Sequence, residues 1–259
     1  SSGKYIIPQE IPTRDDSGYI FRKPHAPEEY DFELYDSEDK LALASEKLKL
    51  FDQDKEVSFD SLSENNKNLL FSILLRPQSL GVRSQYYLSM AISVAVVAAI
   101  SPIVASASVK VKWPNDIYVG DKKLAGILIE NTLRETKIGD CIVGIGLNVN
   151  QDKFLSDAPN PVSMLNITGR EHDISLIAES IRRHMMLALD DVNNQRWSDI
   201  ISAYMRILYR YDGEFHPFRD PQGDFMARIS AVEPDGHIHL IDEKFSERIY
   251  TFKEVEFII

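Results

Sequence analysis

The chain has 259 residues, of which 44% are hydrophobic, so it is long enough for one large domain and a small one. Its formal net charge of −11 at pH 7 disfavours nonspecific binding to nucleic acid or to an anionic membrane, and we expect neither among its partners. The single cysteine, Cys141, excludes a disulfide framework and indicates a reducing compartment, so we expect a cytoplasmic protein.

The first quarter of the chain is polar. Residues 1–30 are charged and proline-rich, which predicts an extended arm and shows no apolar segment of a signal peptide. Residues 31–50 begin with a strand-like stretch and continue with apolar residues at helical spacing, with Asp36 or Ser37 as the cap. The segment 51–57 contains no glycine and no arginine, and favours a solvated acidic loop.

A strand and an apolar helix follow. Residues 68–77 predict a buried strand that a proline ends, and residues 85–100 predict a helix whose small residues suit close packing on a sheet. The stretch 91–109 is apolar enough to suggest a transmembrane helix. Serines and Pro102 interrupt it, so a buried amphipathic helix is the better interpretation.

The next strand carries two lysines on one face. Residues 109–113 alternate Val, Lys, Val, Lys and Trp, which is the period of a half-buried strand. Pro114 and the Asn-Asp pair after it end this strand in a turn. Lys112 is therefore expected at the tip of the strand.

Two further strands flank this tip. Gly120-Asp121 turns the chain back and residues 124–130 run apolar, and in residues 141–150 every odd position is apolar. The even positions then place Gly144, Gly146 and Asn148 on one face. Strand glycines mark the close approach of a ligand or a backbone, and a neighbouring lysine suits an anion such as a nucleotide phosphate. Bulges or packing relief are the commoner reasons for such glycines, whereas a dinucleotide fingerprint is excluded because no helix follows.

The C-terminal part combines two helices and short strands. Residues 157–169 predict a loop, Asp173 caps a helix with an apolar stripe through Val192, and residues 197–209 predict a second helix. From Asp212 on, strand-like stretches at 225–232, 237–241, 248–252 and 255–259 suggest a small barrel. His237 and His239 share a strand face, but the sequence offers no third metal ligand nearby, so exposed strand histidines are favoured.

Three segments of the chain resemble the central motifs of biotin protein ligases, the biotin–[acetyl-CoA carboxylase] ligases. They are residues 112–116 (Lys-Trp-Pro-Asn-Asp), 123–130 (Lys-Leu-Ala-Gly-Ile-Leu-Ile-Glu) and 144–150 (Gly-Ile-Gly-Leu-Asn-Val-Asn). The resemblance extends from about residue 68 to the C-terminus. It implies an α+β fold with a mixed, largely antiparallel sheet flanked by helices, as in class II synthetases, and a C-terminal SH3-like barrel. The implied divisions are an N-terminal arm (1–30), a biotin/lipoate ligase-like domain (31–210) and an SH3-like domain (211–259).

The resemblance also implies a two-step reaction. ATP and biotin, with Mg²⁺, give biotinyl-5′-adenylate and pyrophosphate, and a lysine of a biotin carboxyl carrier domain then attacks the mixed anhydride. Lys112 would be the catalytic residue, offsetting the charge that develops as a carboxylate meets a phosphate. The residues implied to bind biotin and ATP are Trp113, Asn115, Asp116, Lys123, Gly126, Gly144, Gly146, Asn148 and Ser37. Exposed edge strands would allow a homodimer.

The sequence departs from the family on the biotin side. The family reads Ser-Thr-Asn where this chain has Ser37-Glu38-Asp39, and it places a Gly/Arg-rich loop where this chain has the acidic segment 51–57. A ligase that doubles as a repressor would begin with a helix-turn-helix, and none is evident. Three hypotheses remain: an active biotin protein ligase, a catalytically degenerate paralogue that binds or regulates, and a ligase for another acid such as lipoate.

Overall fold

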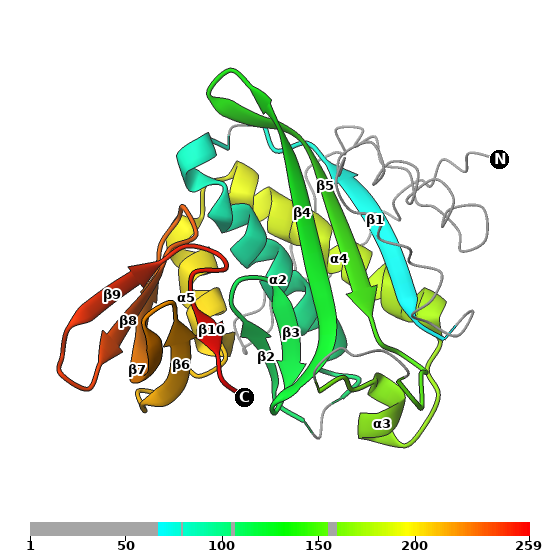
Figure 1. Cartoon of the computed structure of the whole chain (residues 1–259). Coiled ribbons are helices and arrows are strands. Elements are labelled where there is room, and N and C mark those ends of the chain that lie inside the picture. Colours follow the sequence, from blue (N-terminus) through cyan, green and yellow to red (C-terminus); the bar gives the residue numbers. More distant parts are fainter. Residues whose placement is uncertain (1–66, 79, 105–106, 155–159) are drawn as a thin grey trace, which may run out of the picture.

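The structure is a computed structural model of the chain, and it describes residues 67–78, 80–104, 107–154 and 160–259 (Figure 1). The predicted arm, the predicted helix after it and the acidic segment 51–57 lie outside the described residues, and so does Ser37.

A five-stranded sheet forms the centre of the molecule, in the order β1-β5-β4-β3-β2, with every neighbouring pair antiparallel. The α+β class and its antiparallel sheet are therefore confirmed, and no parallel pair occurs among these five strands. The strand predicted over 68–77 is half-buried rather than buried, because Leu70 is 41% exposed. The strands are β1 (Leu69–Leu75), β2 (Val109–Lys112), β3 (Asp116–Val119), β4 (Lys122–Arg134) and β5 (Lys137–Leu147).

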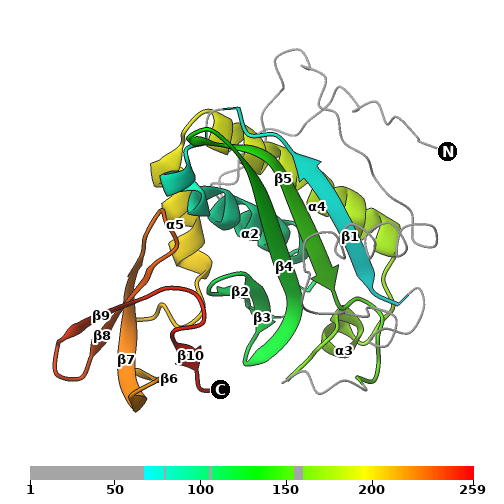
Figure 2. The ribbon, with the colours of Figure 1, turned by 45° about the horizontal axis from the view of Figure 1, so that its top comes forward.

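Helices cover one face of this sheet (Figure 2). A short 3₁₀ turn, η2 (Val82–Ser84), precedes α2 (Tyr86–Ile100), which packs against α4 (Ile174–Asn193) and α5 (Trp197–Ile207) as well as against β2. Because α2 is enclosed in this way, it is apolar on nearly every side, and the expectation of an amphipathic helix here is wrong. Among the described residues, no helix combines the length and the apolar character that a membrane span requires.

The helix caps follow local side-chain chemistry. The Asp173 carboxylate accepts hydrogen bonds from the backbone N–H groups of Ser175 and Leu176, which confirms the predicted cap of α4. The loop predicted over 157–169 contains a short helix, α3 (Met164–Thr168), and the prediction was wrong there. Ser163 and Asn166 form a reciprocal capping box that starts it, a signal that the Pro/Asn-rich composition hid.

The last strands form a second antiparallel sheet, in the order β10-β6-β7-β8-β9. Sequence patterns missed β6, because Pro217 lies inside it and proline argues against a strand. Closure into an SH3-like barrel is not confirmed, because β10 and β9 are the two edges of an open sheet among the described strands. The strands are β6 (His216–Asp220), β7 (Gly223–Val232), β8 (Ile238–Asp242), β9 (Glu247–Tyr250) and β10 (Glu256–Phe257).

The second sheet is tied to the first near the end of β2. The Trp113 indole N–H donates to the Gly236 carbonyl at 3.1 Å, and the Tyr86 backbone N–H donates to the Pro234 carbonyl at 3.0 Å. The Arg210 guanidinium donates to the Ile258 carbonyl at 3.0 Å. These bonds place the β7–β8 hairpin beside α2 and bring the C-terminal strand close to Lys112.

Candidate functional site

Four residues lie opposite one another across four strands. The strand register pairs Lys112 with Asp116, Asp116 with Gly126, and Gly126 with Gly146. Residues that face each other across antiparallel strands point to the same face of a sheet. This is the face away from the helices, because neighbours such as Ile117 are fully buried on the helix side. We call it the site face.

The site face is bare at its centre. Gly126, Gly144 and Gly146 all lie on it, and we call these three residues the glycine floor. An added Cβ atom would find its nearest neighbour 3.5 Å away at Gly126, 3.7 Å at Gly144 and 3.3 Å at Gly146. None of the three has a positive φ angle. Neither crowding by backbone nor backbone conformation therefore requires glycine here, which argues against bulges and packing relief and favours space for a ligand.

A lysine–carboxylate pair lies above this floor. Lys123 Nζ lies 2.7 Å from Asp116 Oδ1, and both atoms lie 3.5 Å from the position of a Cβ atom on Gly126. A bulge produces this arrangement: Ile117 pairs with Ala125, but Tyr118 pairs with Lys123. The extra residue brings Lys123 to the site face, whereas strict alternation from Gly126 would turn it toward the core.

Lys112 takes a different position. Its ammonium lies 4.8 Å from the ring centre of Phe257 and 5.4 Å from that of Tyr118, toward the C-terminal sheet. It makes no hydrogen bond or ion pair with any described residue. Burial lowers the pKa of Lys112, the Asp116 carboxylate opposes this effect, and the Lys123 and Arg210 charges reinforce it.

The other predicted site residues have structural partners. Trp113 points to the helix side, is 3% exposed and bonds to Gly236, so it does not join the group. The Asn115 amide donates to the Ile127 carbonyl, which extends the pairing of β3 with β4. The Asn148 amide donates to the Val162 carbonyl at 3.1 Å and thereby holds the segment before α3.

Several residues that enclose the floor are not among the site residues predicted from the sequence. Tyr118 and Phe257 surround the Lys112 ammonium, and Leu70 and Leu128, 41% and 48% exposed, flank the glycines. The alternation of β3 contains the signal for Tyr118, but nothing local to residue 257 indicates its contact with β2. One ammonium group over a bare floor with apolar margins, and a second on the same face two strands away, suit a ligand that is anionic at one end and apolar or planar at the other.

Comparisons with known proteins agree with this geometry. Residues 62–150 match the model of the biotin/lipoate A/B protein ligase family. The chain is 37% identical over 198 residues to the bifunctional ligase/repressor BirA of Bacillus spizizenii, a match that covers 73% of this chain and 58% of that protein. It is 31% identical over 119 residues to the biotin–[acetyl-CoA-carboxylase] ligase of Mycobacterium tuberculosis, covering 45% and 42%.

Solved structures show the same fold. The biotin protein ligase of Aquifex aeolicus in complex with biotin and ATP aligns with a TM-score of 0.58 at 22% identity, covering 73% of this chain and 78% of that one. A biotin protein ligase-like protein of unknown function from Silicibacter aligns with a TM-score of 0.63 at 14% identity, covering 83% and 90%.

The matched segment resembles the biotin/lipoate A/B protein ligase family, and the fold is that of solved biotin protein ligases. Within that class, the chain is similar in sequence to biotin ligases. It spans 58% of the Bacillus spizizenii relative and 42% of the Mycobacterium tuberculosis relative.

Proposed function

We propose that the chain binds a nucleotide on the glycine floor and uses ATP to activate a carboxylic acid, with biotin as the acid and a biotin carboxyl carrier domain as the acceptor. The observation that supports this most strongly is the bare floor itself, where neither backbone conformation nor contact with backbone atoms requires the three strand glycines. We also propose that a domain boundary lies between residues 210 and 211, so that the C-terminal sheet forms a small domain of its own.

Two lysines supply the charge that this reaction needs. In the first step a carboxylate oxygen attacks the α-phosphorus and pyrophosphate leaves; in the second, a lysine amine attacks the acyl carbon and AMP leaves. The first step brings two anions together, so preorganised cations lower its barrier. Lys123 lies above Gly126, held by Asp116, and is placed to contact the carboxylate and the α-phosphate. Lys112, for which the family resemblance implies the catalytic role, adds a second cation from the side of the C-terminal strand.

The floor fits a nucleotide better than it fits an isolated metal ion. The row from Lys112 to Gly146 contains one carboxylate, Asp116, and Lys123 already pairs with it. Magnesium requires about six oxygen ligands, so the phosphates and water would have to provide most of them. Mg²⁺, when bound, would offset the charge of the departing pyrophosphate, and Asp116 is the residue of the row that would hold it.

A second candidate is a paralogue that binds a nucleotide without making the adenylate. The sequence favours it at one place: residues 51–57 carry no arginine and no glycine where the family has its Gly/Arg-rich loop. Arginine binds phosphates and carboxylates through paired N–H groups, and its loss removes that clamp. A ligase for another acid, such as lipoate, is a third candidate.

One assay separates these candidates. The full chain is incubated with Mg²⁺-ATP and labelled biotin, lipoate or no acid, and both pyrophosphate release and label on a biotin carboxyl carrier domain are measured. Acid-dependent release with transfer supports the ligase and identifies the acid. Nucleotide binding without acid-dependent release supports the paralogue. Absence of ATP binding at millimolar concentration would contradict both.

A further inference from the structure

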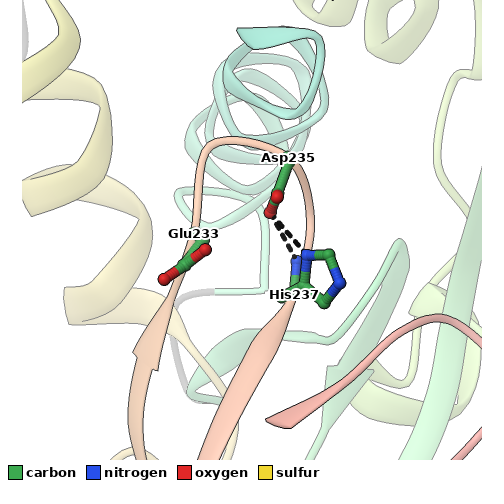
Figure 3. A group of neighbouring side chains, drawn as sticks. All are labelled: Glu233, Asp235 and His237. Carbon is green, nitrogen blue, oxygen red and sulfur yellow. Dashed lines mark hydrogen bonds and ion pairs between the residues drawn. The ribbon is translucent and has the colours of Figure 1, made fainter. Parts of the chain in front are cut away.

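The hairpin between β7 and β8 gathers side chains of the kinds that bind metals. Glu233, Asp235 and His237 place ligand atoms within 4.8 Å of one another (Figure 3). His239 lies two residues further on, with its Nε2 atom 3.0 Å from Glu233 Oε1. The expectation that the two histidines lack a third ligand nearby is therefore wrong, because the turn brings two carboxylates from the end of β7 to them.

His239 has a nitrogen atom without a hydrogen bond. Its Nδ1 atom lies 2.8 Å from Glu247 Oε1, and because a carboxylate only accepts, Nδ1 must carry the proton of that bond. Its Nε2 atom is shielded from solvent and makes no hydrogen bond, although Glu233 Oε1 is close. In the neutral imidazole, Nε2 has a lone pair that no described donor satisfies, and a carboxylate oxygen that cannot donate lies 3.0 Å from it. A cation between these two atoms would satisfy both.

The carboxylate of Glu247 orients His239 in the way that carboxylates orient histidines at metal sites. Metal-binding imidazoles almost always donate their other ring N–H to a carboxylate or carbonyl, which fixes the tautomer and the ring orientation. Glu247 does this for His239, whose side chain is only 12% exposed. The other ring nitrogen, Nε2, lies near Glu233, whose side chain is half-exposed.

The turn that carries these groups is held in one shape. The Glu233 N–H donates to the His237 carbonyl at 2.8 Å, and the Gly236 N–H donates to the Glu233 carbonyl at 3.0 Å. Gly236 has a φ angle of +102°, which glycine adopts without strain. The bond from Trp113 to the Gly236 carbonyl fixes the turn against the rest of the molecule. Backbone that is already ordered reduces the entropy cost of gathering the ligands.

We propose that this hairpin binds one divalent ion of the zinc type, through the imidazoles of His237 and His239 and the carboxylates of Glu233 and Asp235. His237 Nδ1 and Asp235 Oδ1 lie 2.8 Å apart, and His239 Nε2 and Glu233 Oε1 lie 3.0 Å apart. Two ligands on one zinc ion, with bonds of about 2.0–2.1 Å, lie about 3–3.4 Å apart. Both pairs are close to that spacing, and side-chain rotation would bring the His239 imidazole to the group formed by Glu233, Asp235 and His237.

The ligand set selects among metals. Imidazole nitrogen favours zinc, nickel and copper, whereas magnesium and calcium prefer oxygen ligands alone. The ion would displace the proton that His237 shares with Asp235, so binding releases a proton and weakens as the pH falls. The site is independent of the glycine floor and of the function proposed for it.

The test is binding of ZnCl₂ to the full chain by equilibrium dialysis, at pH 7.5 and pH 5.5. The expected result is about one bound equivalent at micromolar zinc at pH 7.5, and a clear loss at pH 5.5. Glu233→Gln, His239→Gln and His237→Gln should each weaken binding at least about tenfold. His216→Gln is the matched control, because it removes a histidine that pairs with Asp212 at 3.0 Å outside the hairpin, and it should bind as the original chain does.

A second measurement keeps the test decisive if a variant is less stable. Co²⁺ in place of zinc gives a visible absorption band in tetrahedral sites, and His237→Gln, which changes a partly exposed side chain, should remove it. Circular dichroism confirms that each variant is folded. Equal zinc binding by the original chain and the three hairpin variants would overturn the proposal, and so would less than a tenth of an equivalent bound at pH 7.5.

Discussion

The ammonium of Lys123 lies 2.7 Å from the carboxylate of Asp116, and a β-bulge between Ile117 and Tyr118 makes this contact possible. Because of the bulge, Leu124 and Ala125 are both buried, while Lys123 and Gly126 lie together on the site face. Bulges often redirect a side chain next to a functional site. The pair therefore links a local irregularity of the backbone to the charge that stands over the glycine floor.

Lys123→Met should remove that charge with little effect on the fold. We expect acid-dependent pyrophosphate release to fall about 10²–10³-fold, the usual effect of removing one preorganised group that stabilises developing charge. The free energy of unfolding should fall by no more than about 1 kcal/mol, because the ion pair with Asp116 is partly exposed. Lys122→Met, which changes the exposed neighbour, is the control and should keep the original rate. Equal rates in the two variants would remove Lys123 from the mechanism.

Lys112 should make nucleotide binding sensitive to alkaline pH. Burial lowers its pKa, so Lys112 loses its charge at a lower pH than an ordinary lysine. The nearby tyrosines do not interfere, because burial raises the pKa of both Tyr118 and Tyr209 to about 12. The dissociation constant of ATP, measured from pH 7 to pH 10, should rise at the alkaline end. Lys112→Arg should shift that rise to higher pH, whereas an identical profile would exclude Lys112 from the nucleotide site.

The buried charge of Lys112 should lower the stability of the folded protein at neutral pH. A lysine whose pKa is lower in the folded protein than in the unfolded chain reduces stability below the folded pKa, and this cost disappears as the pH rises toward the unfolded value. Lys112→Met removes the charge and keeps an apolar stem against the rings of Tyr118 and Phe257. At pH 7 its melting temperature should be no lower than that of the original chain, although activity is lost. Lys110→Met is the control for a lysine on the same strand face, and a clear fall in the melting temperature of Lys112→Met alone would contradict this reasoning.

Gly144→Val should separate stability from ligand binding. The atoms nearest to a Cβ at this position are 3.7 and 3.8 Å away, and valine favours strands more than glycine does, so the variant should fold with unchanged or higher stability. Its side chain would occupy the floor, and ATP affinity should fall at least about tenfold, a free-energy change of about 1.4 kcal/mol. Glu130→Val, on the same face of β4 but beyond the glycines, should bind ATP normally. Normal affinity in Gly144→Val would mean that the glycines are not a ligand floor.

The sequence predicts the faces of the strands better than it predicts their side-chain contacts. The alternation in residues 141–150 places the glycines correctly, because a period of two leaves no other choice once the odd positions are buried. It does not reveal that Lys123 lies over the floor, since a bulge breaks the period and leaves two adjacent apolar residues as its only trace.

Contacts over long distances along the chain escape local patterns entirely. Phe257 reaches Lys112 because the Arg210 guanidinium holds the carbonyl of the neighbouring Ile258, a bond across 48 residues. Trp113 shows another limit of sequence motifs. The family resemblance implies a ligand contact for Trp113, whereas adjacent strand residues point to opposite faces and its buried indole bonds to Gly236.

The Trp113 indole should instead matter for the attachment of the C-terminal sheet. Trp113→Phe keeps an aromatic ring in this buried position but leaves the Gly236 carbonyl without its donor. A buried polar group that loses its partner costs about 1–3 kcal/mol, and we expect the free energy of unfolding in urea to fall by that amount. Trp197→Phe is the matched control, because Trp197 stacks on Tyr87 at 4.4 Å and its indole makes no hydrogen bond to a described residue, and the smaller ring should still stack. Equal denaturation midpoints for the two variants would show that the bond to Gly236 contributes nothing, and that apolar packing alone holds the hairpin against α2.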